Sequence, residues 1–377
     1  MIAGDLFPIP ANLSFFSNGD IESLFGKKIC DIFSNADLSI CNLEGALTDN
    51  DERCSKIGPV LVSPTKVISS YKKLGIDCCM LANNHITDGG HQGVLDTLRV
   101  LEKEEIGYLG AGPNENEIRR SCIYELGGTK IGLYNVCERM FNKPTPSSGG
   151  AWLYDEYIVC REIAELKSRC DYLIVVYHGG IEQFRFPSRE NRKRFHRMAD
   201  NGADMILSQH THCVGCEEWY NDAYLLYGQG NFLFRNLRPG QTDEAVLIEV
   251  IITDGTPKVV RHKVRCEKNM FVRYDEYQDF SDFEERSKLL NDEKYVDQQF
   301  AQFCLKRLEL YLSACKSPSR LMRVIMKFLP SVYKKWLFDS YNPRNLLFML
   351  YILWSEQKGE EAMAGLERLL YEKTRKK

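Results

Sequence analysis

Short apolar runs alternate with helix-like patterns along the first 210 residues, and this alternation constrains the fold more than any other feature of the chain. Six of the runs have the length and composition of strands: 1–4, 38–41, 78–82, 130–136, 172–177 and 204–208. The run 172–177 is nearly all apolar, which is typical of a strand covered on both faces. Helical spacing of apolar residues follows His91, and a second helix pattern covers 191–201. The sequence therefore predicts a layered α/β domain.

After residue 220 the pattern changes to strands alone. These later strand candidates are 223–227, 245–253 and 258–264. Asp254-Gly255 lies between the last two and predicts a β-hairpin, and Gly127-Gly128 predicts another. We expect both pairs of strands to be antiparallel neighbours in a sheet.

The strand patterns stop at about residue 268, and a different sequence pattern follows. Residues 280–377 are predicted to form helices, interrupted by three prolines, Pro318, Pro330 and Pro343. We therefore expect two domains, residues 1–267 and a helical C-terminal region, 268–377.

Composition excludes several classes of protein. The chain has 377 residues, 27% of them charged, and a formal net charge of −3, so nothing global favours nucleic-acid binding. The first residues lack the parts of a secretory signal, and the longest apolar run, 346–354, is shorter than the roughly 20 residues of a membrane span. The 14 cysteines are scattered. We therefore expect reduced thiols and a cytoplasmic location, with the inner face of the membrane as the alternative.

Polar side chains that can bind metals follow five of the apolar runs. They lie where the strands are predicted to end: Asp5, Asn42 with Glu44, Asn83-Asn84-His85, His178, and His210 with His212. In an open α/β sheet, sites form at the carboxyl ends of the strands. Each residue alone also suits a helix cap or a turn, whereas His210 and His212 would point the same way on an extended segment. Together they favour a dinuclear site for first-row divalent metals.

These motifs occur in a recognisable order. They are Gly-Asp5, Asn-Leu-Glu44-Gly, Ala-Asn-Asn-His85, His178-Gly-Gly-Ile-Glu, His210-x-His212 and Tyr-Gly-Gln-Gly-Asn231-Phe. The series resembles the CapA (PGA_cap) family over about residues 1–240; that family is a branch of the calcineurin-like metallophosphoesterase superfamily associated with bacterial capsule synthesis. The resemblance implies a four-layer α/β/β/α metallophosphoesterase-like sandwich of class α/β, followed here by a helical C-terminal extension.

The resemblance also implies roles for individual residues. The ligands that it implies, for two divalent ions such as Mn, Fe or Zn, are Asp5, Glu44, Asn84, His178, His210 and His212. Glu44 would bridge the ions, with Asp5 and His212 on the first ion and the other ligands on the second. His85 would be the catalytic residue that faces the oxyanion of the substrate. Phe7 stands where the wider superfamily has another ligand of the first ion, which would therefore have one ligand fewer.

Three further residues are candidates for substrate binding. Arg185 and Arg189 begin a basic cluster, and arginine forks match phosphate and carboxylate groups. Asn42, in the Asn-Leu-Glu motif, is the third. The remaining basic residues of the cluster are predicted to be solvated on a helix surface.

A Cys213-x-x-Cys216 motif directly follows the last histidine. Such a pair suits structural thiols, half of a zinc site or a redox pair. No second pair follows at zinc-finger spacing, so we favour structural thiols.

Basic and apolar residues interleave in 316–344, where seven basic residues accompany one acidic residue. This pattern is typical of a helix on an anionic membrane surface. It is also typical of a helical subdomain that packs on the core or on a second copy of the chain, which is the interpretation we favour.

The resemblance implies a protein of capsule or exopolysaccharide (or poly-gamma-glutamate) biosynthesis that carries out metal-dependent phosphoester hydrolysis or phosphoryl-linked transfer. The alternative is a non-catalytic, membrane-peripheral assembly factor for a capsule polymerase that keeps a remnant of the metal site. Amide chemistry on poly-glutamate is a third hypothesis. The expected partners are an anionic or phosphorylated cell-envelope polymer precursor, capsule-synthesis membrane proteins and further copies of the chain in a homo-oligomer, but no nucleic acid.

Overall fold

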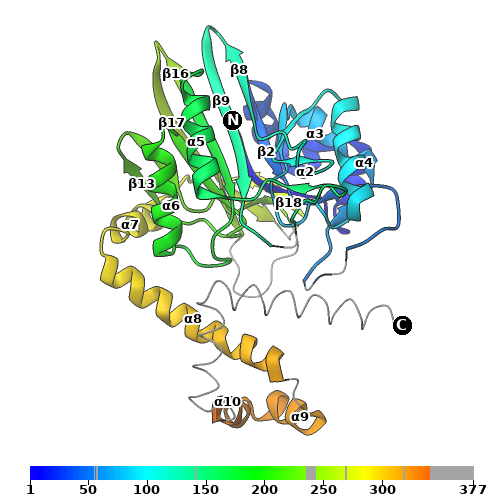
Figure 1. The fold of residues 1–377 in the computed structure, drawn as a ribbon, viewed down its shortest axis with the longest axis vertical. Coiled ribbons are helices and arrows are strands. Elements are labelled where there is room, and N and C mark those ends of the chain that lie inside the picture. Colours follow the sequence, from blue (N-terminus) through cyan, green and yellow to red (C-terminus); the bar gives the residue numbers. More distant parts are fainter. Residues whose placement is uncertain are drawn as a thin grey trace. The chain divides into compact units, whose positions relative to one another are not determined.

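The computed structural model describes residues 1–339 apart from 55, 57, 141, 235–242, 268–269 and 317–318. The chain forms two compact units, of which the first is Met1–Asp297 and the second begins at Gln298. Figure 1 labels several elements of each. The segment between residue 267 and Asp297 therefore belongs to the first unit.

The first unit is built on two large β-sheets. Sheet A consists, in spatial order, of β18 (Phe271–Tyr274), β17 (Thr256–Glu267), β16 (Glu244–Thr253), β1 (Ile2–Leu6), β2 (Ile40–Leu43), β5 (Cys78–Met80) and β6 (Gly107–Leu109), with β15 (Asn231–Leu233) paired to β1. Sheet B consists of β13 (Glu217–Tyr220), β14 (Ala223–Leu226), β12 (Met205–Gln209), β11 (Tyr172–His178), β9 (Thr129–Cys137) and β8 (Ser121–Leu126). Strands β1, β2, β5 and β6 run parallel, as do β9, β11, β12 and β14.

Helices cover the outer face of each sheet (Figure 1). Those on sheet A are α1 (Leu13–Asn18), α2 (Ile21–Ser34), η1 (Thr65–Val67), α3 (Ile68–Leu74) and α4 (Gly90–Lys103). Those on sheet B are α5 (Glu156–Lys167) and α6 (Arg189–Asp200). Two small strand pairs complete the unit, β3 (Ala46–Leu47) with β4 (Val62–Ser63) and β7 (Ala111–Gly112) with β10 (Gly150–Ala151).

Three separate apolar cores lie between these layers. Successive side chains of a strand point to opposite faces, so on β11 Leu173 and Val175 pack against α5 and α6, whereas Ile174 and Val176 pack against sheet A. A third core lies between sheet A and its own helices. The four-layer α/β/β/α sandwich is thereby confirmed. Apolar side chains on both faces explain why the run 172–177 shows no polar alternation.

The strand predictions are confirmed along the first unit. Each of the six early runs forms a strand whose ends differ from the prediction by at most two residues. Both hairpins are also present, since Asp254-Gly255 joins β16 to β17 and Gly127-Gly128 joins β8 to β9. All four turn residues have positive φ, between 51° and 84°, as tight hairpin turns require.

The prediction that strands end at about 268 is wrong. β18 pairs antiparallel with β17, and Arg273 of β18 donates hydrogen bonds to the carbonyl oxygens of Ser23 and Leu24 in α2. The strand is four residues long and lies at the edge of sheet A. A run this short carries too few alternations to be detected by pattern.

The helices predicted after residue 280 are confirmed where the structure describes them. They are α7 (Ser281–Leu289), α8 (Glu293–Lys316), α9 (Arg320–Phe328) and α10 (Pro330–Asp339). Pro330 begins α10, where a proline is tolerated, while Pro318 and Pro343 lie outside the described residues. The run 346–354 also lies outside them. None of the helices in the described part of the chain has an apolar stretch long enough to cross a membrane.

Candidate metal centre

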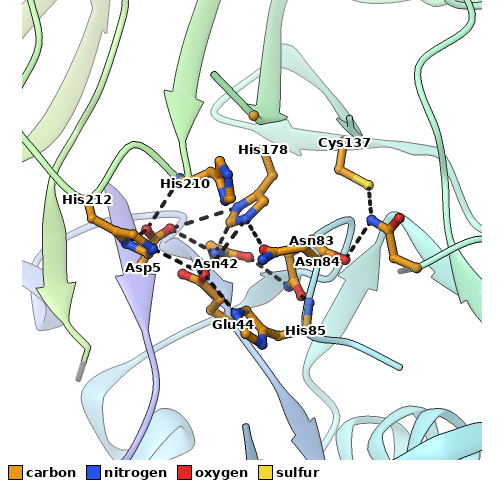
Figure 2. A network of polar contacts seen from close by, with 12 residues as sticks. Asp5, Asn42, Glu44, Asn83, Asn84, His85, Cys137, His178, His210 and His212 are labelled. Atoms are coloured by element: carbon orange, nitrogen blue, oxygen red, sulfur yellow. Dashed lines mark hydrogen bonds and ion pairs between the residues drawn. The ribbon is translucent and has the colours of Figure 1, made fainter. Parts of the chain in front are cut away.

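The carboxyl ends of parallel strands from both sheets meet at one edge of the sandwich. Asp5 lies on β1, Glu44 follows β2, and Asn84 and His85 follow β5, all in sheet A. Sheet B contributes the end of β11 and the turn after β12. Figure 2 shows the side chains that point toward one another there, which are Asp5, Glu44, Asn84, His85, His178, His210 and His212. Each is at most 8% exposed, so sequence-distant polar groups form one buried cluster.

Glu44 lies at the centre of this cluster. Its Oε1 is 3.8 Å from Nε2 of His178 and 4.0 Å from Nε2 of His212. Two groups of three side chains share Glu44, and within each group the potential ligand atoms lie within 4.8 Å of one another. We name them the first triad (Asp5, Glu44 and His212) and the second triad (Glu44, His178 and His210).

Each triad contains a histidine with one ring nitrogen that makes no hydrogen bond to the described residues. Nδ1 of His212 lies 2.8 Å from Oδ1 of Asn231, which can only accept, so Nδ1 donates this hydrogen bond and Nε2 is the nitrogen that faces Glu44. His210 places Nε2 3.5 Å from Oε1 of Glu138, while its buried Nδ1 has no hydrogen-bond partner among the described residues. A buried imidazole nitrogen without a partner is expected where a metal supplies the missing contact.

Burial sets the protonation of the cluster. Burial lowers the pKa of His178 well below 6.5, and His210 nearby lowers it further. Burial lowers the pKa of His210 in the same way. Burial alone would raise the pKa of Asp5, but the hydrogen bond to His212 and the nearby histidines outweigh it, so this pKa lies far below 3.8. Neutral imidazoles beside an ionised carboxylate are the protonation states that metal binding requires.

The donor set fits divalent metal ions. A shared carboxylate, a second carboxylate and three imidazoles suit first-row divalent ions, and Asn84 adds an amide oxygen next to His178, 2.9 Å from its Nε2. Without ions, so many buried polar groups would cost stability.

Comparisons with known proteins identify the family of this chain. The sequence model of the family of the bacterial capsule synthesis protein PGA_cap matches residues 1–236. The chain belongs to the PGA_cap family. It is 32% identical over 181 residues to the PGA biosynthesis protein CapA of Bacillus subtilis (strain 168), covering 46% of this chain and 47% of that protein. It is 24% identical over 220 residues to the capsule biosynthesis protein CapA of Bacillus anthracis, covering 53% and 54%.

The chain spans about half the length of these curated relatives of the PGA_cap family. Among solved structures, a hypothetical protein from Thermus thermophilus aligns with a TM-score of 0.43 and 16% identity, over 69% of this chain and 98% of the other.

In this member of the PGA_cap family, the backbone conformation of the two histidines after β12 differs from the sequence prediction. The strand ends at Gln209, and His210 and His212 have φ of 86° and 54°. The extended segment predicted for them is therefore wrong, because both adopt left-handed backbone in a turn. Left-handed backbone at a non-glycine residue costs about 1–3 kcal/mol and is found at functional sites.

Asn42 lies inside the cluster rather than at its surface. Its Nδ2 donates to Oδ1 of Asp5 at 2.8 Å and lies 3.3 Å from Nδ1 of His178, while its Oδ1 accepts a hydrogen bond from Asn83. The side chain is fully buried, and both ends of its amide are engaged. These contacts place Asn42 where it can position Asp5 and His178, and its predicted contact with substrate stays a prediction.

Of the two arginines predicted to bind substrate, Arg189 lies elsewhere. Arg189 begins α6, and its guanidinium pairs with Asp297 and lies 3.7 Å from Glu293. Arg185 lines a small groove together with Arg286. The structure therefore does not bring Arg189 to the metal ligands, because a carboxylate 108 residues later in the chain binds it.

The rest of the basic cluster is mostly ion-paired rather than simply solvated. Arg192 pairs with Glu218, Lys193 with Glu190 and Arg197 with Glu156, and Arg194 contacts Tyr177. Helix α6 thus presents little net positive charge to a ligand.

Cys213 and Cys216 are buried free thiols, as the structural interpretation predicts. Burial raises the pKa of Cys213 to about 11. A thiol protonated at neutral pH is a poor nucleophile and a poor metal ligand.

Four residues around the site were not predicted. Nδ1 of His85 lies 2.7 Å from Oδ2 of Asp88 and 3.0 Å from Nζ of buried Lys56, which pairs with Asp88 and donates to the carbonyl oxygen of Asn84. The other two are Asn231 beside His212 and Glu138 beside His210. Asp88 lies three residues after His85 and could have been found, whereas Lys56 lies in a loop with no recognisable pattern.

Proposed function

We propose that this chain carries out metal-dependent phosphoester hydrolysis or phosphoryl-linked transfer in capsule or exopolymer synthesis. The observation that carries the proposal is that one buried carboxylate, Glu44, is common to both triads. A carboxylate shared by two sites reduces the repulsion between two cations held close together. Two such ions, when bound, stabilise the charge on a phosphoryl group as Lewis acids.

The proposed ligands are the polar side chains that lie where the strand ends of the two sheets meet. They are Asp5, Glu44, Asn84, His178, His210 and His212. Asn42 would hold Asp5 and His178 in place, and Asn231 would hold His212. The number of ions and the choice among Mn, Fe and Zn are part of the proposal.

His85 is the proposed catalytic residue. Nδ1 of His85 lies beside Asp88 and Lys56, so Nε2 is the nitrogen that faces the cluster, 4.0 Å from Oε1 of Glu44. Burial lowers the pKa of His85 below 6.5, partly offset by Asp88. When protonated, Nε2 can give its proton to a leaving oxygen, which makes His85 a candidate general acid. Lys56 balances the buried charge of Asp88 and thereby keeps this arrangement stable.

The proposed substrate is an anionic or phosphorylated cell-envelope polymer precursor. Two relatives are named for capsule biosynthesis and PGA biosynthesis. Amide chemistry on poly-glutamate rests on such names alone, whereas the donor set supports phosphoryl chemistry. Interaction with capsule-synthesis membrane proteins, homo-oligomer formation and a cytoplasmic location at or near the inner membrane face stay predictions.

The test combines metal analysis of the purified chain with hydrolysis of a chromogenic phosphodiester in added manganese. Glu44→Gln should lose bound metal and turnover together. His85→Ala should retain the metal and lose turnover about 100-fold or more, the range for a general acid. His262→Ala, on β17 and paired with Glu249, is the matched control and should change neither. Full turnover in Glu44→Gln would overturn the proposal.

One observation favours the non-catalytic assembly factor as a second candidate. Phe7 is buried in the apolar core with its ring against Gly45, so this position supplies no ligand to the first triad. A first site with three donors could bind its ion too weakly for catalysis. Metal-loaded protein without turnover on phosphomonoesters or phosphodiesters would support this role over the enzyme.

A further inference from the structure

Lys56 is a buried lysine on the loop between β3 and β4, next to the residues that follow β5. Its side chain is only 3% exposed, and its ammonium group pairs with Asp88. The same nitrogen, Nζ, lies 3.0 Å from Nδ1 of His85 and donates to the carbonyl oxygen of Asn84 at 3.2 Å. One ammonium group therefore contacts the backbone of a proposed metal ligand and the ring of the proposed catalytic residue.

The contact with Asn84 helps to hold one peptide group in place. The peptide that joins Asn84 to His85 has two polar ends, and each has a hydrogen-bond partner. Lys56 donates to its carbonyl oxygen, and Oδ1 of Asn83 accepts from its N–H at 3.0 Å. Asn83 is fixed in turn, since its Nδ2 donates to the carbonyl oxygen of Leu43 at the end of β2. The orientation of this peptide group therefore depends on Lys56 at one end and Asn83 at the other.

The orientation of this peptide matters because the side chains on both sides of it enter the cluster (Figure 2). Oδ1 of Asn84 lies 2.9 Å from Nε2 of His178. On the other side, Nε2 of His85 lies 4.0 Å from Oε1 of Glu44. A rotation of the peptide would change backbone angles of both residues and so move both side chains. Ligands and catalytic groups must be held within about 0.5 Å of their productive positions.

The loop that carries Lys56 has other anchors on Asp88. The backbone N–H of Leu61 donates to Oδ2 of Asp88, and the backbone N–H of Cys54 donates to its carbonyl oxygen. The ion pair of Lys56 with Asp88 also adds little net stability, because the desolvation of buried charges offsets their attraction. Attachment of the loop therefore does not account for the contacts that the ammonium group makes with the residues after β5.

We propose that Lys56 is a positioning residue that holds the metal ligand Asn84 and the catalytic residue His85 in their working orientation. The inference rests on the proposed function, which supplies the roles of those two residues. Lys56 acts through them and does not touch the substrate, because protein groups on three residues surround its buried ammonium group.

The test compares Lys56→Met with Lys56→Arg in the full chain. Methionine lacks the charge and the donors of lysine, whereas arginine keeps both. Lys56→Met should weaken manganese binding at the second triad, next to Asn84, about tenfold or more, the range for residues that orient a ligand. At saturating manganese it should also lower kcat for a chromogenic phosphodiester about tenfold or more, with little change in KM. Lys56→Arg should recover a large part of both losses. Calorimetric titration measures the affinity.

Lys167→Met is the matched control, because Lys167 has the same kinds of partner far from the metal centre. Its Nζ pairs with Asp204 and donates to the carbonyl oxygen of Asp171. These two residues directly precede β12 and β11, whereas the proposed ligands lie at the other ends of both strands. This variant should lose stability in urea without a change in manganese affinity, kcat or KM.

A second variant keeps the inference testable if Lys56→Met alone does not fold. Lys56→Met combined with Asp88→Asn leaves no buried charge unpaired. Its manganese affinity at the second triad should be lowered as in Lys56→Met, because the lost hydrogen bond to the carbonyl oxygen of Asn84 is one that Asp88 does not make. Circular dichroism of each variant shows whether the fold is retained.

The outcomes separate this inference from the proposed function. If the unsubstituted chain binds manganese without turnover, the proposed function fails, and the manganese affinities still test Lys56. Unchanged affinity in the folded variants without Lys56 would overturn the positioning role, whether or not the chain turns over. Equal losses in Lys56→Met and Lys56→Arg, or an equal loss in Lys167→Met, would overturn it too, because the effect would not depend on this ammonium group. A chain that binds no metal would overturn both.

Discussion

The two triads share one carboxylate but differ in what surrounds them. The second triad has Asn84 next to His178, so four donors would be available to an ion there. The first triad has three, because Phe7 packs into the core instead of facing the cluster. Metal affinity generally rises with the number of well-placed donors. The difference teaches that the two triads are unequal by construction, so that, if two ions bind, one would be held tightly and the other would exchange.

Removing one histidine from each triad should reveal this inequality with the largest effect. His212→Ala leaves the first ion with two protein donors, so the chain should bind one equivalent of metal instead of two. His210→Ala leaves the second ion with three donors. Two equivalents of metal should therefore still bind, but the ion of the second triad should bind more weakly than in the unsubstituted chain. The metal content of each variant, after dialysis against a series of free manganese concentrations, measures the number of bound ions and their affinity.

Equal losses in these two variants would contradict the inequality of the triads. His262→Ala serves again as the control, because this histidine lies outside the cluster.

A smaller effect is expected from the residues that orient the histidines. Glu138→Gln should weaken the ion of the second triad about 10–100-fold, and Asn231→Ala should do the same for the first, because orienting partners contribute this much to metal affinity. Calorimetric titration with manganese resolves the two ions. Each substitution should leave the other ion unchanged, and a loss at both would mean that the triads do not act separately.

The smallest effect is on the stability of the metal-free chain as a function of pH. His178 and His210, both in the second triad, have pKa values lowered below 6.5, so the unfolded chain binds protons that the folded chain does not. Stability should therefore fall as the pH drops below 6.5, by up to about 1.4 kcal/mol per pH unit for each group. Urea unfolding at a series of pH values measures this slope.

His178→Gln should reduce that slope, and an unchanged slope would show that other groups dominate the acid sensitivity. Bound metal should shift the fall in stability to lower pH, since it also requires neutral imidazoles.

Sequence alone predicted the parts of this site that depend on local pattern. Asp5, Glu44, His178 and the other proposed ligands follow apolar runs, and parallel strands bring their carboxyl ends to one edge. The two apolar faces of β11 made its strand visible in the same way. These features repeat in every layered α/β fold, so pattern is sufficient to find them.

The failures concern contacts between distant segments. The sequence around Arg189 predicted an anion-binding residue, but in the structure Arg189 pairs with Asp297. Nothing in the sequence around Lys56 predicted its ion pair with Asp88. β18 forms because β17 is available at the sheet edge. No window of the sequence contains both partners of such a pair, so local reasoning could not predict them.

The cluster takes its donors from both sheets, and this has a consequence for the mechanics of the fold. Asp5 and Glu44 belong to sheet A, whereas His178, His210 and His212 belong to sheet B. Ions bound to both sets would add a cross-link between two layers that are otherwise joined by an apolar core, which is non-directional, and by a few hydrogen bonds such as that of Gln209 to the carbonyl oxygen of Ala3. Occupancy would then lock the relative register of the sheets, and stripping the ions with a chelator would let the layers shear before either one unfolds.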